Sequence, residues 1–274
     1  MTHKNKNRNT PSPQQKNDRR PSPRQYDDDL IWGRQPVREA MAASLPLYRI
    51  MLQEGLTGSI LAEIRRLAEQ RGIALDIVPR TQLDALVPGA NHQGIVAAAA
   101  PYSYRDMDEL LQQTDAAPLP SMLLILDHLQ DPHNLGALIR TAAATGINGV
   151  IIPRDRACGI TPVVYKTSAG AIVNVPVAQV VNIAREIDRL KERGFWIAGA
   201  EMKGSSVFYE TKLPFPLALV LGSEGSGLSR LVREKCDLLL RIPMVENVQS
   251  LNVAVAGGIL IYEAYRRRTA AIKK

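Results

Sequence analysis

The chain contains 274 residues, of which 45% are hydrophobic, and this is enough apolar sequence for one large or two small domains. It has no apolar run of about 18 residues, so a membrane-spanning helix is not expected. The formal net charge is +7, and residues 1–24 carry most of it, with seven Lys or Arg against one acid. The positive charge is therefore weak evidence that the rest of the chain binds nucleic acid.

Residues 1–29 are predicted to be a disordered basic tail, because Asn, Gln, Ser and Pro dominate them and cannot bury enough surface to fold. The tail is either an electrostatic arm for nucleic acid or a solubilising extension. It has no apolar stretch of the secretory kind, so we expect a cytoplasmic protein in which Cys158 and Cys236 are reduced thiols. No metal is expected, since the histidines and cysteines lack metal-ligand spacing.

Residues 30–101 are predicted to form a small α/β domain. Apolar positions recur at helical spacing over 59–71, and Gly72 is placed to end that helix. The expected helices are 37–43, 59–71 and 81–86, and the expected strands are 48–52, 75–78 and 95–100. Residues 102–118, with prolines and mixed polarity around them, are predicted to be a linker that contains one short helix.

Residues 119–274 are predicted to form a second α/β domain with a mostly parallel sheet, because strands and helices alternate along them. Residues 122–126 are a nearly continuous apolar run, which is typical of a strand covered on both faces. The other expected strands are 150–152, 175–177, 196–200, 217–221 and 238–242, and the expected helices are 134–145, 183–193, 228–235 and 251–268.

A polar turn, DHLQDPHN at 127–134, follows the strand at 122–126. Ligands of open α/β sheets lie at the carboxyl ends of the strands, and helix N-termini favour anions, so this turn is a candidate site. Asn134 is either a group of that site or only the N-cap of the next helix. Arg140 lies in a strongly apolar helix, which favours a guanidinium placed to bind phosphate.

A glycine-rich loop with one acid, GSEGSG at 222–227, follows the apolar strand at 217–221. It is not a P-loop, because no Gly-Lys-Ser/Thr follows, and its glycine spacing differs from the dinucleotide motif. Glu224 is either a partner for a helix dipole or a side chain that fixes an arginine or a ligand hydroxyl. Ser250 is the expected N-cap of the last helix, and Asn252 falls in its first turn, within reach of Gly222.

Three segments resemble the signature motifs of the SPOUT superfamily, TrmH/SpoU branch, and occur in the same order: DPHNLGALIRTAAATG, LVLGSEGSGL, and IPM followed by SLNVAVAGGILIYEA. The segments WGRQPVREA and HQGIVA resemble the start and the end of the L30e-like substrate-binding domain of that branch. Members of the branch are S-adenosyl-L-methionine (AdoMet)-dependent RNA ribose 2′-O-methyltransferases. The two-domain layout is most similar to members that methylate a guanosine of 23S rRNA.

The resemblance implies a deep trefoil knot in the C-terminal sheet, with AdoMet bound in it. It also implies an obligate homodimer, in which the last helix packs on its mate and each active site uses both chains. It places cofactor contacts at Gly222, Ile242 and Leu251, with Ala200 and Met244 nearby. The implied catalytic residues are Arg140, Asn134, Glu224, Ser250 and Asn252, and the implied RNA contacts are Arg38, His92 and Gln93.

The implied reaction is direct attack of a ribose 2′-oxygen on a methyl group, without a covalent enzyme intermediate. Family analogy makes Arg140 a base, but a guanidinium stays protonated, so we expect it to bind phosphate and stabilise the developing alkoxide. Asn134 and Glu224 are expected to orient Arg140 and the ribose. The alternatives are a tRNA ribose 2′-O-methyltransferase and a non-catalytic RNA-binding protein of the same fold; the order of the glycines disfavours a nucleotide-dependent oxidoreductase.

Overall fold

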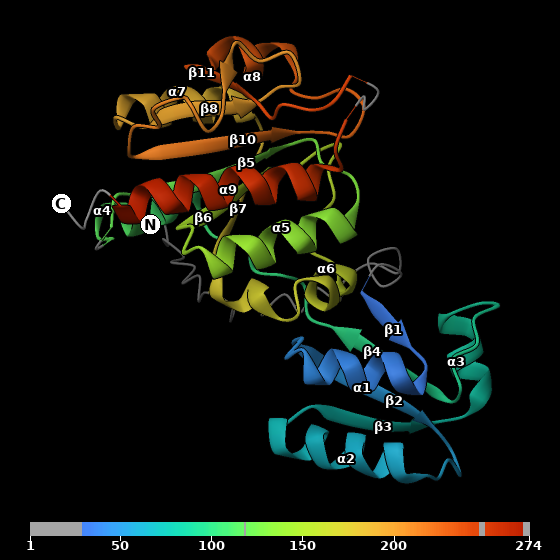
Figure 1. Ribbon diagram of the computed structural model, residues 1–274. Coiled ribbons are helices and arrows are strands. Elements are labelled where there is room, and N and C mark those ends of the chain that lie inside the picture. The colour runs from blue at the N-terminus through green and yellow to red at the C-terminus, as the bar shows by residue number, and fades with distance from the viewer. Residues whose placement is uncertain (1–28, 118, 247–249, 271–274) are drawn as a thin grey trace, which may run out of the picture.

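The computed structural model describes residues 29–117, 119–246 and 250–270, which form two separate sheets with their helices (Figure 1). The N-terminal sheet has the order β1-β4-β2-β3. Its strands are β1 (Leu30–Trp32), β2 (Leu47–Gln53), β3 (Ala74–Val78) and β4 (Ile95–Ala99). Only the β2–β3 pair is parallel, while β4 runs antiparallel to both β1 and β2. This sheet is therefore mixed.

Side chains of the N-terminal sheet alternate between two cores. Ile50 and Leu52 of β2 pack toward α1 (Arg34–Ala42) and α2 (Ser59–Arg71), whereas Met51 packs toward Leu83 of α3 (Arg80–Leu86). The period of two along the strand thus buries both faces. The helix at 59–71 has the predicted bounds, and Gly72 ends it in the left-handed conformation at φ 65°.

The C-terminal sheet is parallel throughout and has the order β7-β6-β5-β10-β8-β11-β9, which confirms the predicted parallel arrangement. Its strands are β5 (Met122–Asp127), β6 (Gly149–Pro153), β7 (Val177–Val180), β8 (Trp196–Ala200), β9 (Ser206–Val207), β10 (Leu217–Gly222) and β11 (Leu238–Arg241). The central strand β10 lies between β5 and β8, so its carboxyl end meets theirs at one edge.

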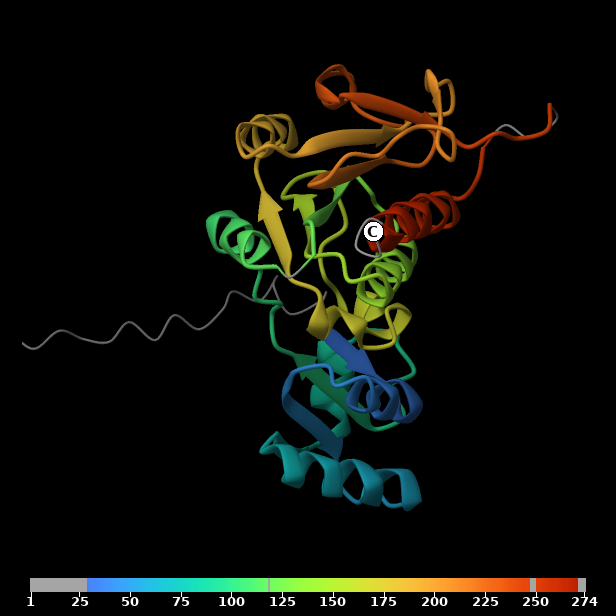
Figure 2. The ribbon, with the colours of Figure 1, turned by 60° about the vertical axis from the view of Figure 1, so that its left-hand side comes forward.

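Helices cover both faces of this sheet, and Figure 2 shows it between the two layers. One face packs against α5 (Pro132–Ala144) and α9 (Val253–Ala270). The other packs against α4 (Met107–Asp115), α7 (Ile183–Glu192) and α8 (Arg230–Lys235). Strand β5 feeds both cores, with Leu124 in the first and Leu123 in the second. Its fully apolar sequence follows from this double burial.

Several helix starts differ from those predicted: α1 begins at Arg34 and not at 37, α8 begins at Arg230 and not at 228, and α5 and α9 differ because of their caps. Helix α5 begins at Pro132, because the side chain of Asp131 accepts a hydrogen bond from the His133 amide (2.9 Å) and is the N-cap. Asn134 is therefore inside the first turn and is not the cap. At α9 the Oδ1 atom of Asn252 accepts from the Ala254 amide (2.9 Å), so Asn252 caps this helix in place of Ser250.

Other elements were not predicted, or were predicted with different limits. The short strands β1 and β9, the helix α6 (Pro162–Thr167) and the 3₁₀ turn Ala171–Asn174 were missed, and the strand expected at 175–177 begins only at Val177. The helix in the predicted linker is present as α4, and it buries Leu110 and Leu111 against the C-terminal sheet. The trefoil knot stays a prediction, and residues 1–28 of the predicted basic tail (1–29) lie outside the described residues.

Gly136 lets α5 approach α6 closely. A Cβ at this position would lie 1.8 Å from Thr167 Oγ1 and 3.0 Å from the Ser168 backbone nitrogen. The Gly136→Ala change gains up to about 1 kcal/mol of helix propensity. It should nevertheless lower the free energy of unfolding by about 1–3 kcal/mol, because such overpacking forces the backbone to shift. Thermal unfolding of both proteins measures this, and an unchanged or raised midpoint in the variant would contradict the packing described.

Candidate functional site

The loop after β10 folds back on the end of its own strand. Ser223 and Gly227 exchange two backbone hydrogen bonds (3.1 and 3.0 Å), and Gly225 and Gly227 have φ of +85° and +66°. A Cβ on Gly222 would lie 2.1 Å from the Gly227 carbonyl carbon and 2.4 Å from the Leu228 nitrogen. Because these are backbone atoms, a side-chain movement could not relieve the clash. Only glycine fits at the strand end, and the tight loop holds Glu224 at its tip.

Three residues distant in sequence meet through their side chains, and we call them the Asn134–Glu224–Asn252 cluster. Asn134 Nδ2 donates to Glu224 Oε1 and to Asp131 Oδ2 (3.0 Å). Asn252 Nδ2 donates to Asn134 Oδ1 (3.0 Å) and to Glu224 Oε1 (3.3 Å). The cluster thereby joins the first turn of α5, the loop after β10 and the cap of α9. Asn134 is buried, whereas Glu224 and Asn252 are exposed, so the outer side of the cluster faces solvent.

The setting of the cluster favours a negative charge. Glu224 accepts two amide hydrogen bonds, one from the first turn of α5 and one from the cap residue of α9. The positive ends of two helix dipoles therefore lie beside its carboxylate. In the part of the chain that the structure describes, no Lys or Arg forms an ion pair with Glu224. The carboxylate is held by amides alone and stays available on its exposed side.

A cavity of about 550 Å³ opens next to the cluster, and Glu224, Ser250 and Asn252 lie on its wall. Its apolar part comes from Leu221, Leu240 and Leu260, which project from β10, β11 and α9. The residues predicted to contact a cofactor all line it: Ala200, Gly222, Ile242, Met244 and Leu251. This volume and the mixture of an apolar floor with a polar rim suit a small ligand with both kinds of surface.

Arg140 is not part of this arrangement within one chain. It is exposed on α5 and is absent from the cavity wall. Among residues 29–117, 119–246 and 250–270, no hydrogen bond or ion pair of its side chain is found. The bonds of Asn134 and Glu224 go to each other, to Asp131 and to Asn252, so these residues do not orient the Arg140 of their own chain as predicted.

Two acids at the same sheet edge were not singled out from the sequence. Asp131 caps α5 and also accepts a hydrogen bond from Asn134. Asp127 is buried at the end of β5, where it contacts His128 Nδ1 (2.6 Å) and accepts from the Ser229 amide at the start of α8 (2.6 Å). In the sequence, Asp127 could have been recognised as an acid that directly follows the entirely apolar run at 122–126.

Neither cysteine is poised as a nucleophile. Burial raises the pKa of the Cys158 thiol to about 11 and that of Cys236 to about 12, with nearby acids adding to both shifts. Thiols with such values are protonated at neutral pH and react slowly.

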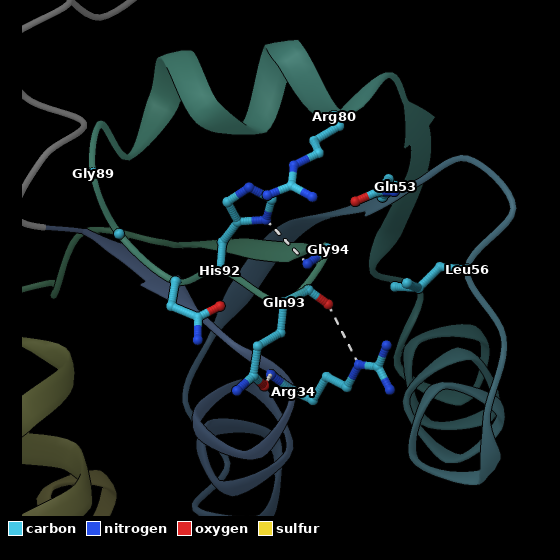
Figure 3. A pocket seen from close by; sticks show the side chains of 10 residues that line it. Arg34, Gln53, Leu56, Arg80, Gly89, His92, Gln93 and Gly94 are labelled. Atoms are coloured by element: carbon cyan, nitrogen blue, oxygen red, sulfur yellow. Dashed lines mark hydrogen bonds between the residues drawn. The ribbon is translucent and has the colours of Figure 1, made fainter.

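The predicted RNA contacts lie apart from the cavity, in the N-terminal part. Arg38 lies on α1, with its Nη1 atom 3.9 Å from Glu63 Oε2. His92 is only 3% exposed, and its ring contacts Asp84 Oδ1 (2.9 Å) and accepts from the Gly94 amide (3.0 Å). Gln93 is exposed at φ +51°. His92 and Gln93 line a second hollow, shown in Figure 3, whereas Arg38 does not.

Two kinds of feature, a metal-binding group and a membrane-spanning helix, are not found among the described residues. Within them, no group of three or more His, Cys, Asp or Glu side chains is arranged to hold a metal ion. Their helices include none with the length and apolar character needed to cross a membrane.

The two hydrogen bonds that Asn134 donates within the cluster can be tested by substitution. Asn134→Asp keeps the shape of the side chain but replaces an amide that donates to two carboxylates with a third carboxylate. We expect a loss of about 1–3 kcal/mol of unfolding free energy at pH 7, because two acceptors lose their donor and like charges meet.

The pH dependence of this loss is the measurement. Between pH 7 and pH 4, a proton taken up by the introduced carboxyl group restores a donor, so the difference from wild type should shrink as the pH falls. The Asn134→Ala variant is the control, because its difference should not shrink in this way. A pH-independent loss in Asn134→Asp would contradict the cluster.

Two family models match the chain. The SpoU rRNA Methylase family matches residues 121–262, which span most of the C-terminal sheet and the cavity. The model for RNA 2'-O ribose methyltransferase substrate binding matches residues 30–105, which span the N-terminal sheet.

Similar proteins agree with these matches. A Staphylococcus aureus protein named "Putative TrmH family tRNA/rRNA methyltransferase" is 46% identical over 242 residues, which cover 88% of this chain and 97% of that protein. The SpoU methyltransferase AviRb from Streptomyces viridochromogenes, in complex with the cofactor AdoMet, has a TM-score of 0.68 at 23% identity and covers 88% of this chain and 90% of its own. An AdoMet-bound rRNA methyltransferase from Sinorhizobium meliloti has a TM-score of 0.61 at 23% identity, covering 86% of each chain. The chain therefore belongs to the SpoU/TrmH family of RNA ribose 2′-O-methyltransferases.

Proposed function

We propose that this protein transfers a methyl group from AdoMet to the ribose 2′-hydroxyl of a guanosine in 23S rRNA. The observation that carries the proposal is the cavity between β10 and α9, where all the predicted cofactor residues meet beside the Asn134–Glu224–Asn252 cluster. Membership of the family and the AdoMet bound in the AviRb structure support the choice of cofactor. The two-domain layout supports large-subunit rRNA as the substrate, and a cytoplasmic location fits that substrate.

The residues of the cavity fit AdoMet in chemical character. Leu221, Leu240 and Leu260 offer apolar surface for an aromatic ring, and Ser250 with the backbone near Gly222 and Leu251 offers polar groups at the rim. When bound there, AdoMet supplies an electrophilic methyl group. The protein contributes mainly by holding the ribose oxygen in line with that methyl, and such positioning lowers a barrier strongly.

Arg140 binds the phosphate beside the target ribose and stabilises the negative charge that develops on the 2′-oxygen. Its guanidinium remains protonated, so it acts by charge and not as the base. The absence of any ion pair at Arg140 among the described side chains leaves the guanidinium free for a phosphate. As the new oxygen–carbon bond forms, the methyl–sulfur bond breaks and the hydroxyl proton passes to solvent water.

The absence of Arg140 from the cavity wall supports a homodimer in which each active site uses both chains. Helix α9 buries Gly257, Leu260 and Ile261 against its own chain, yet Val255 and Tyr262 are each 53% exposed on other sides of the helix. The first ten residues of α9, 253–262, carry no charged side chain, and a helical segment that is apolar all round is normally buried all round. A mate packed on α9 covers this surface and brings its Arg140 to the site.

Methyl transfer from labelled AdoMet to 23S rRNA and, separately, to tRNA tests the proposal, with 2′-O-methyl ribose located by blocked alkaline cleavage. The proposal predicts one protected guanosine in 23S rRNA. A product in tRNA alone would leave the chemistry intact but contradict the substrate, and the name of the S. aureus relative includes both RNA types. A protein that binds RNA but neither AdoMet nor a methyl group would be the non-catalytic alternative.

Arg140→Ala should lower transfer by at least about 100-fold, the usual effect of losing a charge-stabilising donor. AdoMet affinity should stay within about twofold of wild type, because Arg140 does not line the cavity. Calorimetric titration and single-turnover transfer measure the two quantities. Arg185→Ala, an exposed arginine on α7, is the matched control and should change neither. Loss of AdoMet binding in Arg140→Ala would contradict the role assigned.

If each active site uses residues of both chains, two variants that are inactive alone should recover activity in a mixed dimer. Arg140→Ala and Glu224→Ala should each be inactive as homodimers. When they are co-expressed with different tags, a mixed dimer carries one intact site, and random pairing gives up to about a quarter of wild-type activity. A mixed preparation that stays inactive, although mixed dimers are isolated by both tags, would show that each site belongs to a single chain.

A further inference from the structure

A polar hollow lies on the N-terminal sheet, at the end of the molecule away from β10 and α9 (Figures 1 and 3). Its volume is about 850 Å³, which is in the range of sites that hold molecules of nucleotide size. Its wall contains two guanidinium groups, three side-chain amides and a histidine, with Leu56 as the large apolar member. The wall residues are Arg34, Gln53, Leu56, Arg80, Gly89, Ala90, Asn91, His92, Gln93 and Gly94.

Residues 92–94 form one side of the hollow, and a hydrogen bond and close packing hold them in place. The Gly94 amide donates to His92 Nδ1 (3.0 Å), so the proton of the neutral ring is on Nε2, which faces Asp84 Oδ1 at 2.9 Å. A Cβ on Gly94 would lie 2.8 Å from Leu56 Cδ2, so the loop also packs tightly on its other side. His92 thereby acts as a support that presents Gln93 to the hollow.

The loop in turn positions the guanidinium of Arg34. The Arg34 amide donates to Gln93 Oε1 (3.2 Å), and Arg34 Nε donates to the Gln93 carbonyl (3.3 Å). The two terminal nitrogens of Arg34 make no hydrogen bond or ion pair with any other residue that the structure describes. A guanidinium held by Nε, with both terminal nitrogens free, is arranged for bidentate binding of an oxyanion.

Arg80 supplies the second charge from the start of α3, on the other side of Gly94 in Figure 3. Its side chain is 70% exposed, and its Nε lies 3.6 Å from Asp84 Oδ2. Asp84 thus pairs with Arg80 and also contacts His92, but it does so from outside the wall of the hollow. Among the wall residues there is no Asp or Glu, and the net charge facing the hollow is positive.

We propose that this hollow binds one unpaired nucleotide of the RNA substrate, with its phosphate held between Arg34 and Arg80. The inference rests on the proposed function and adds a second anchoring point far from the methylated ribose. Gln53, Asn91 and Gln93 line the hollow, and their side-chain amides carry donors and acceptors that suit a base edge. The wall has no Phe, Tyr or Trp, and its His92 ring is only 3% exposed, so the hollow recognises the nucleotide by charge and hydrogen bonds and not by aromatic stacking.

Arginine variants test the phosphate contacts by RNA binding, independently of methyl transfer. The probes are in vitro transcribed 23S rRNA and total tRNA, with Kd measured over a range of salt concentrations. Arg34→Gln and Arg80→Gln together should weaken binding of the preferred RNA by about tenfold or more, and the slope of log Kd against log salt should fall by about 0.7 for each lost contact with single-stranded RNA. At saturating RNA, kcat and AdoMet affinity should be unchanged, since neither residue lines the cavity.

Arg65→Gln is the matched control, because Arg65 is exposed on α2 and does not line the hollow; it should keep the wild-type affinity and salt slope. The single variant Arg80→Gln gives a second test that does not depend on the folding of the double variant. The Arg80 side chain is largely exposed, so its replacement should not unfold the protein. An Arg34/Arg80 double variant with wild-type affinity and salt slope would overturn the inference, as would a wild type that binds neither RNA. A wild type that binds RNA but transfers no methyl would refute the proposed function while the arginine test still decides this inference.

The side-chain amides of the hollow can be tested separately from its arginines. Gln53→Ala and Asn91→Ala should leave the salt slope unchanged, because they remove no charge. They should instead alter the relative affinity for short single-stranded RNAs that differ in one base. Equal affinities for all such RNAs in wild type would overturn the part of the proposal that assigns base contacts to the amides.

Discussion

The amide bridge from Asn134 to Glu224 and Asn252 is the constraint on which the candidate site depends. It ties together three chain segments that are distant in sequence: the start of α5, the loop after β10 and the start of α9. Each hydrogen on the Asn134 amide nitrogen points to a carboxylate, and its oxygen accepts from Asn252, so the amide has only one orientation that satisfies its partners. Hydrogen bonds to charged groups contribute about 1.5–3 kcal/mol each when buried, and less at the exposed edge of this cluster.

Close packing holds α9 in the position that the bridge needs. A Cβ on Gly257 would lie 2.4 Å from Leu138 and 2.6 Å from Leu221, so the absence of a side chain lets α9 rest directly on α5 and β10. At the far end, Arg268 is buried and donates to the Gly146 carbonyl (2.8 Å) at the C-terminus of α5. Burial lowers the pKa of Arg268, but the negative end of the α5 dipole favours its charge. The cavity wall is thus fixed at both ends of α9.

Much of the fold follows from local sequence. The apolar runs of β5 and β10 predict strands buried on both faces, and the period of 59–71 with Gly72 gives the correct bounds of α2. The caps were harder, because Asp131 competes with Asn134, and Asn252 with Ser250, for the same role. Tertiary contacts decide between them: Asn134 is drawn to Glu224, 90 residues away, and is therefore not the cap. Strands as short as β1 and β9 exist only through their neighbours and leave no period to detect.

The candidate site was predictable as a set of motifs but not as a geometry. Sequence order could not show that the cofactor residues share one cavity, nor that Arg140 lies outside it, since that depends on the face of α5 it occupies. In the same way, the support of His92 by Asp84 depends on the packing of α3 and has no sequence signal.

The central claim is that the tight loop at Gly222 and its cluster create the AdoMet cavity. Calorimetric titration of AdoMet into wild type and the Gly222→Ala variant tests it most directly, with circular dichroism to verify that the variant is folded. The account predicts one AdoMet per chain in wild type and no measurable binding in Gly222→Ala, because a methyl group there collides with the Gly227–Leu228 backbone. Equal affinity in the two folded proteins would contradict it.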